Sequence, residues 1–152
     1  MFRSLLAIFC LFSTCLHAQI QTPEQFLGYK LGEAFTLHHD IVRYIQHLAS
    51  QSPRLKVQEY GKTYEKRALQ VVFVSAPENL AKLEEIRQNN LKSAGLLAGQ
   101  ASGLQLPILW LGYTVHGNEP AGTEASMALL HQLASENSEK VQNWLKNMLI
   151  II

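Results

Sequence analysis

Three apolar, β-branched runs, well separated along the chain, place the strongest constraint on how it can fold. They cover residues 69–75, 108–115 and 148–152. Nearly continuous apolar runs of this length are typical of strands buried on both faces of a sheet. The segments between them repeat their apolar residues every three to four positions, which is typical of amphipathic helices. The alternation predicts an α/β fold in which helices flank a mixed central sheet.

The boundaries of the other elements follow from proline, glycine and capping residues. We expect Thr36 to cap a helix that runs to Gln51, because Ser52-Pro53 disfavours its continuation. The polar stretch Glu65–Arg67 lies between two strand-like runs, 55–64 and 69–75, and predicts a β-hairpin. Further helices are expected at 77–97, 121–134 and 138–146, after a lead-in segment at 19–35 with one short helical turn. In the helix at 121–134, the side chains expected to face inward are Ala125, Ala128, Leu129 and Leu133.

The last expected strand lies at the very end of the 152 residues. A domain rarely finishes inside a central apolar strand, and an unpaired run such as Leu149–Ile152 favours aggregation. The sequence therefore indicates a truncated domain, with residues 19–152 as its N-terminal part.

Residues 1–18 have the pattern of a secretory signal peptide. Arg3 supplies a positive start, Leu5–Leu16 is an apolar run too short to span a bilayer comfortably, and Ala18 precedes the expected cleavage. An uncleaved anchor or a buried helix is the alternative, and Cys15 offers a weak match to a lipid attachment site. The pattern predicts a secreted protein, extracellular or periplasmic, with no stable membrane span after cleavage.

Cleavage would remove Cys10 and Cys15, which are the only two cysteines. It would also remove Arg3, so the 13 basic and 12 acidic residues of the chain become 12 of each. A neutral chain without a basic face gives no reason to expect nucleic acid or an anionic membrane surface as a partner. Without thiols, a metal site would have to use histidine, aspartate or glutamate.

The segment with the clearest chemistry is His116-Gly117-Asn118-Glu119, which follows an expected strand and precedes an expected helix. Ligands of α/β proteins gather at the carboxyl ends of strands. Imidazole nitrogen and carboxylate oxygen are both zinc donors, and a catalytic zinc takes three protein ligands and one water. His116 and Glu119 would be two of them, with a histidine beyond residue 152 as the third. The alternative is an ordinary loop histidine beside a glutamate that the helix dipole favours.

The same segment resembles the zinc-binding motif of the zinc carboxypeptidases related to carboxypeptidases A and B. Gly61–Leu69 is similar to the hairpin stretch G-x-S/T-x-E-G-R-x-I/L of that family, and the resemblance extends from about residue 22 to the end. It implies that His116 and Glu119 bind Zn²⁺ and that the substrate is a peptide or protein. Lys66 stands where the family usually has glycine, and Asn118 where its animal digestive members have arginine. The family's remaining catalytic residues match no position here, so we assign no general base and no substrate-binding residue.

Other polar candidates carry less weight. His38 and His39 are adjacent on an expected helix and point about 100° apart, so they cannot easily share a metal. His47 and His131 lie on amphipathic helices, and the helix dipole accounts for Glu124. We expect Trp110 and Trp144 to lie in or near the core.

Three functions remain open on the sequence. The first is a zinc-dependent peptide hydrolase of the metallocarboxypeptidase type, whose catalytic site is incomplete in this chain. The second is a zinc deacylase of the aspartoacylase or succinylglutamate desuccinylase type, which shares His-Gly-Asn-Glu but typically lacks both the signal peptide and the hairpin pattern. The third is a catalytically inactive fragment that binds at most a metal or a partner.

Overall fold

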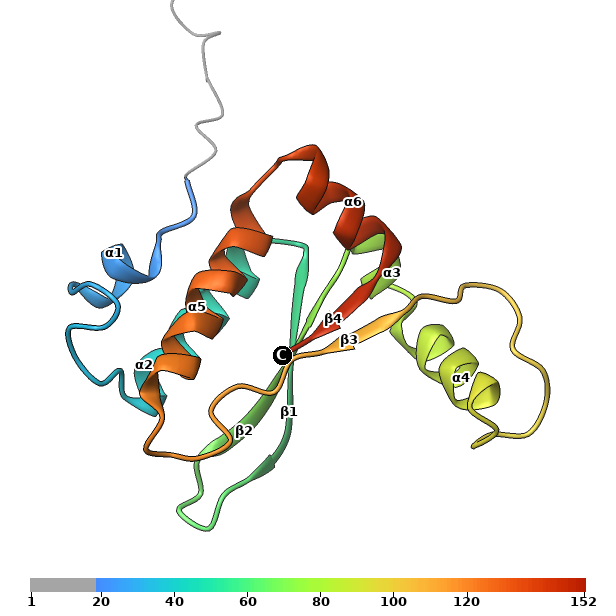
Figure 1. Cartoon of the computed structure of the whole chain (residues 1–152), viewed down its shortest axis with the longest axis horizontal. Helices are drawn as coiled ribbons and strands as arrows, with labels where there is room; N and C mark the ends of the chain where they lie inside the picture. Colours follow the sequence, from blue (N-terminus) through green and yellow to red (C-terminus); the bar gives the residue numbers. More distant parts are fainter. Residues whose placement is uncertain (1–18) are drawn as a thin grey trace, which may run out of the picture.

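The computed structural model describes residues 19–152, so the predicted signal peptide at 1–18 lies outside the described residues. Six helices and four strands follow one another along these residues (Figure 1). None of these helices is both long and apolar enough to cross a membrane. In chain order, the elements are α1 (Pro23–Leu27), α2 (His38–Gln51), β1 (Leu55–Lys62), β2 (Ala68–Val74), α3 (Pro77–Leu80), α4 (Leu83–Ser93), β3 (Ile108–Trp110), α5 (Pro120–Ser135), α6 (Glu139–Asn147) and β4 (Leu149–Ile151).

The four strands form one mixed sheet in the order β1-β2-β4-β3. β1 and β2 form the predicted antiparallel hairpin, and β4 pairs antiparallel with β2 and parallel with β3. The predicted α/β class, a mixed sheet flanked by helices, is confirmed. The predicted strand at 148–152 is present as β4, which occupies the interior of the sheet with both of its edges paired.

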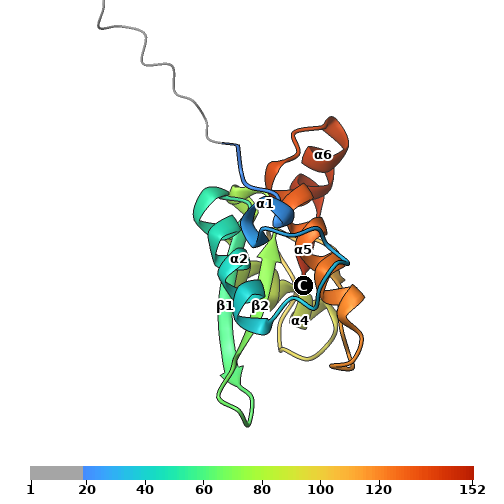
Figure 2. The same cartoon turned by 90° about the vertical axis from the view of Figure 1, so that its left-hand side faces the viewer.

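One face of the sheet carries the larger core. α2 and α5 lie side by side against it, and Figure 2 shows them with α1 in front of the strands. Tyr44 and Leu48 from α2 meet Met127 and Leu130 from α5, and all four side chains are fully buried. Each such side chain stabilises the fold by about 1.5–3 kcal/mol relative to an exposed position.

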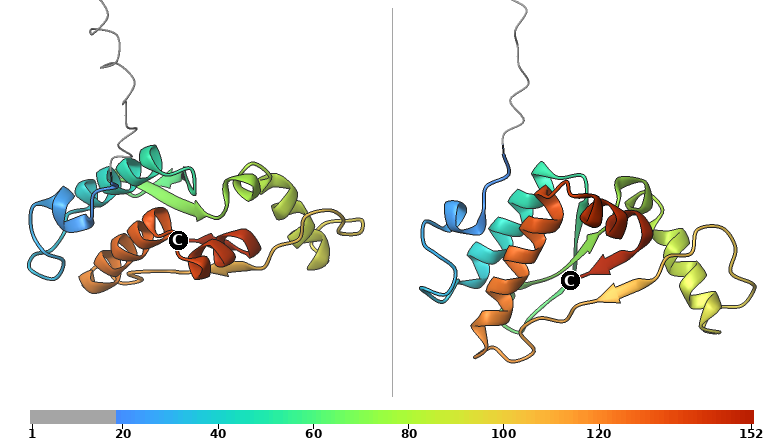
Figure 3. Two further views of the ribbon diagram at one scale, coloured as in Figure 1. Left: turned by 90° about the horizontal axis from the view of Figure 1, so that it is seen from above. Right: turned by 45° about the horizontal axis from the view of Figure 1, so that its top comes forward.

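The opposite face is covered only in part. α4 lies at the far end of the molecule from α1, as the views in Figure 3 show. A small cluster of Leu80, Ile86 and Leu149 is buried on this side. The remainder of the face stays open, which explains why only Val72 and Val74 of β2 are buried. The prediction that residues 69–75 are buried on both faces is therefore wrong for most of the run.

The predicted helix at 77–97 is two helices, α3 and α4. Leu80 and Ile86 are six residues apart, and a straight helix would point them about 120° apart. The break at Ala81–Lys82 brings both side chains into the same cluster. α4 then ends early, because Gly95 adopts φ 71° and the Leu96 N–H donates to the Leu91 carbonyl, as in a Schellman motif.

The predicted strand at 108–115 is also too long. Within residues 19–152, β3 pairs only with β4, and the last bond of this ladder is donated by the Leu111 N–H to the Ile151 carbonyl. Beyond it, Thr114 has φ 52° and turns the chain. Trp110 lies on this strand at the edge of the sheet and is 74% exposed, so the prediction of a core tryptophan is wrong for it. Trp144 is also exposed.

Two predictions about the helices on the main core also need correction. Leu37, not Thr36, is the N-cap of α2. In α5, Ala125 and Ala128 are exposed, and Leu133 is the one predicted inward residue that is fully buried. By contrast, the cap of α6 is as predicted, since the Ser138 hydroxyl accepts from the Val141 N–H.

Thr36 and Glu124 are instead partners in a contact that joins the lead-in segment to α5. The Glu124 side chain is 7% exposed and accepts hydrogen bonds from the Gly32 N–H and from the Thr36 hydroxyl, the latter at 2.9 Å. Glu124 thus has a structural partner 88 residues away in the sequence. The helix dipole alone does not account for it.

We expect Glu124→Ala to lower the free energy of unfolding by about 1–2 kcal/mol, because both donors lose a charged acceptor. Urea denaturation followed by circular dichroism would measure the change. Glu33→Ala is the matched control, since Glu33 is exposed in the same segment and accepts only from the Lys30 N–H; its effect should stay within about 0.5 kcal/mol. Equal stability of the two variants would contradict the role given to Glu124.

Candidate metal site

His116 and Glu119 lie in the loop that joins β3 to α5. The loop leaves the carboxyl end of β3, and Glu119 becomes the N-cap of α5 ahead of Pro120 in the first turn. Proline is favoured there because its missing N–H is not needed and its φ suits the helix. The Glu119 N–H donates to the His116 carbonyl at 3.1 Å, which closes the turn between them.

The two side chains point toward each other. The His116 Nδ1 lies 3.2 Å from the Glu119 Oε1, and the side chains are 70% and 59% exposed. In a tetrahedral zinc site with ligand bonds near 2.0–2.2 Å, two donor atoms stand about 3.4 Å apart. The separation of the imidazole nitrogen and the carboxylate oxygen therefore fits a shared zinc ion, and both donor types are ones that zinc accepts.

One other pair in the described residues has similar spacing. The His39 Nε2 lies 3.4 Å from the Asp40 Oδ2 at the start of α2. Asp40, however, also forms an ion pair with the Arg43 guanidinium at 3.2 Å. This guanidinium repels a divalent cation and occupies the Oδ1 of the carboxylate. Within residues 19–152, the only ion-pair partner of Glu119 is His116, so His116 and Glu119 form the better cation site.

No third ligand joins this pair. Among residues 19–152, no three histidine, cysteine, aspartate or glutamate side chains lie close enough together to hold one metal ion. His38 contacts the Ala68 carbonyl at 3.1 Å, and Glu124 is engaged with the lead-in segment. The assignment of His116 and Glu119 as zinc ligands stays a prediction. These two side chains would supply two of the three protein ligands that a catalytic zinc takes.

A groove of about 600 Å³ opens beside the loop. Tyr113, Thr114 and Gly117 of the loop line one side of it. Other walls come from the N-terminal part of α2 and from the end of the hairpin. The groove is mainly apolar, because these segments contribute side chains such as Ile41, Ile45 and Leu69. The candidate metal site therefore lies next to a concave surface that could receive part of a ligand.

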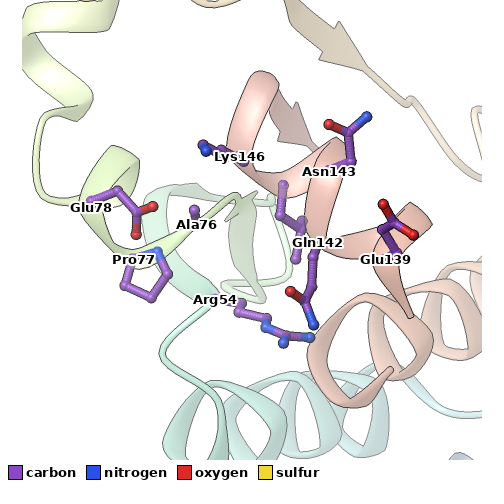
Figure 4. A pocket seen from close by; sticks show the side chains of 9 residues that line it. Arg54, Ala76, Pro77, Glu78, Glu139, Gln142, Asn143 and Lys146 are labelled. Atoms are coloured by element: carbon purple, nitrogen blue, oxygen red, sulfur yellow. The ribbon is translucent and has the colours of Figure 1, made fainter. Parts of the chain in front are cut away.

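Another pocket, of about 510 Å³, lies between α3, α6 and the residue before β1 (Figure 4). Its arginine, Arg54, donates through its guanidinium to the carbonyl of Glu136 at 2.7 Å and to the Asn137 side chain. These bonds connect the start of β1 to the end of α5. Glu78 and Glu139 are the carboxylates of this pocket, and no histidine lines it. The pocket lacks the donor set of a zinc site.

The loop is attached to α5 by residues that the sequence did not single out. The hydroxyl oxygens of Thr114 and Thr123 are 2.6 Å apart, and Gly122 lies directly against Thr114. The positive φ of Thr114 cannot be read from the residue type, because threonine rarely adopts it. Small residues just after Pro120 were the available sequence signal for this close approach.

A strand, a short loop with a histidine–glutamate pair and a helix together define a candidate zinc site of the kind found in zinc hydrolases. The zinc carboxypeptidase family model matches residues 41–152. The chain belongs to this family, which confirms the resemblance seen in the hairpin and in the loop. A comparison with curated proteins found no match.

We expect His116→Ala and Glu119→Ala each to weaken zinc binding by at least about tenfold, because a single remaining donor no longer chelates the ion. Isothermal titration calorimetry with zinc would measure the dissociation constant in each variant. His39→Ala should leave that constant unchanged, because Arg43 neutralises Asp40. If His39→Ala weakened zinc binding as much as His116→Ala does, the ion would bind elsewhere.

Proposed function

We propose that residues 19–152 contribute the zinc-binding loop of a zinc-dependent peptide hydrolase of the metallocarboxypeptidase type. At the level of the family, the match supports zinc-dependent hydrolysis of peptides. The observation that carries the residue assignment is the 3.2 Å approach of the His116 Nδ1 to the Glu119 Oε1 at the carboxyl end of β3. His116 and Glu119 are the proposed zinc ligands.

A zinc ion held there would lower the pKa of a bound water and polarise a substrate carbonyl. The part of the chain described supports this chemistry in two ways. The turn presents one imidazole and one carboxylate donor, and both side chains are exposed, so a substrate can approach them. The groove lined by Tyr113 and Gly117 lies beside this opening and offers apolar surface to a peptide.

The described residues supply two ligands, whereas a catalytic zinc takes three. We propose that the third ligand, and the groups that act on the substrate, come from outside residues 19–152, and that these residues alone do not catalyse hydrolysis. We also propose export from the cytoplasm, which rests on the charge and hydropathy pattern of residues 1–18.

Hydrolysis is expected only from a polypeptide that contains both residues 19–152 and a third zinc ligand. The test substrate is an N-blocked dipeptide with a free C-terminal carboxylate. In such an active polypeptide, His116→Ala or Glu119→Ala should lower kcat/KM by at least about 10³, because the zinc-bound nucleophile is lost. Removal of zinc with a chelator and its readdition should abolish and restore the activity, which is measured by release of the C-terminal amino acid.

Two outcomes would contradict the proposal. Faster hydrolysis of an N-acylated single amino acid than of the dipeptide would favour the zinc deacylase instead. Full activity in both alanine variants would exclude this loop as the zinc site. His39→Ala serves as the matched control and should keep the activity of the unmodified polypeptide.

A further inference from the structure

The side chains of His116 and Glu119 have few contacts of their own. Both are exposed, and the only side-chain hydrogen bond that either one makes within residues 19–152 is the one they share. Packing against neighbouring side chains therefore cannot set their direction. Their convergence has to come from the backbone of the loop that carries them.

Both ends of this loop are fixed to each other. Thr114 stands two residues before His116, and Gly122 and Thr123 stand three and four residues after Glu119, in the first turn of α5. The hydroxyl oxygens of Thr114 and Thr123 are 2.6 Å apart, so one donates to the other. We refer to Thr114, Gly122 and Thr123 together as the threonine clamp.

Gly122 allows the two ends to come this close. A methyl group at position 122 would lie 2.9 Å from the Thr114 Oγ1 and 3.1 Å from the Thr114 backbone nitrogen. Contacts this short force one of the two segments to move. An alanine at this position would therefore push the start of the loop away from α5.

The backbone of Thr114 itself indicates that the clamp is under tension. Its φ of 52° lies in the left-handed region, which a β-branched residue rarely adopts. Such a conformation persists only where surrounding contacts enforce it, and these positions concentrate at functional sites. Here the enforcing contacts are the hydroxyl pair and the close approach of Gly122.

We infer that the threonine clamp is a positioning device that aims His116 and Glu119 at one cation. The inference rests on the proposed function, since it takes those two residues as the zinc ligands. The clamp closes the ends of the segment 115–121 and so restricts the directions that the two ligands can take. In this role its three residues do not contact the metal, and they act on the two ligands through the loop.

The test compares zinc affinity with folding stability in single variants of the whole chain. Thr123→Val replaces the hydroxyl with a methyl of similar size, Thr123→Ser keeps the hydroxyl, and Gly122→Ala adds the crowding methyl. Ser135→Ala is the control, because Ser135 lies at the other end of α5 and donates only to the His131 carbonyl. Zinc titrations followed by the His116 ring protons give the affinity, and urea denaturation shows that each variant is folded.

Thr123→Val and Gly122→Ala should raise the zinc dissociation constant by about tenfold, the lower end of what supporting residues contribute at metal sites. Thr123→Ser and Ser135→Ala should keep the affinity of the unmodified chain. Because Thr123→Val preserves volume, it remains informative if the crowded Gly122→Ala variant does not fold. A Thr114→Val, Thr123→Val double variant should lose no more affinity than Thr123→Val alone, because one hydroxyl pair is removed in both.

The results separate the two proposals. If Thr123→Val changes stability but binds zinc as tightly as the unmodified chain, the clamp is only structural and the inference is overturned while the zinc site stands. If His116→Ala and Glu119→Ala also bind zinc unchanged, the proposed function and the positioning role fail together.

Discussion

The pairing of β4 with both β2 and β3 is the interaction on which the rest of the structure depends. In the described part of the chain, the hairpin β1–β2 and the strand β3 do not pair with each other, and β4 alone joins them into one sheet. Ile150 from β4 reaches the larger core, whereas Leu149 reaches the smaller one. The three residues of β4 therefore contribute to both cores, and the length of β4 determines where β3 ends. The position of the candidate metal loop follows from that end point.

Unequal covering of the two sheet faces explains most of the exposure pattern. α2 and α5 bury one face, and their side chains exclude water from Tyr44 and Met127. The Tyr44 hydroxyl donates to the Gln21 carbonyl, and burial of the phenol raises the pKa of Tyr44, with a smaller contribution from the Glu24 carboxylate. On the opposite face, Trp110 stays exposed because α4 covers only the far part. Apolar sequence alone does not reveal which face a helix will cover.

The sequence predicted features that depend on local chemistry. The hairpin, the Ser138 cap, the strand nature of 148–152 and the loop with His116 and Glu119 all follow from turn residues, capping residues or apolar runs a few positions long. Prediction from the sequence failed where a residue far away along the chain determines the local structure. Thr36 looked like a helix cap, but it bonds to Glu124 across 88 residues. The strand at 108–115 was cut short because its only partner in the described residues pairs no further than Ile151. For the close approach of Gly122 to Thr114, the small residues just after Pro120 were the one signal in the sequence, and the positive φ of Thr114 had none.

A turn of four residues is well suited to hold two zinc ligands and poorly suited to supply a third. His116 and Glu119 converge within one turn, so binding a cation needs ordering of only their side chains, at about 1–2 kcal/mol each. A further donor in the same turn would compete for the same space. In the proposed function, this further donor comes from another element whose end faces the loop. β3 and β4 run parallel, so their carboxyl ends open at the same edge of the sheet. The groove that contains Gly117 also contains Ile152, just past the end of β4. This edge is where a third ligand would join the pair, because there the sheet brings a second backbone end to the metal loop.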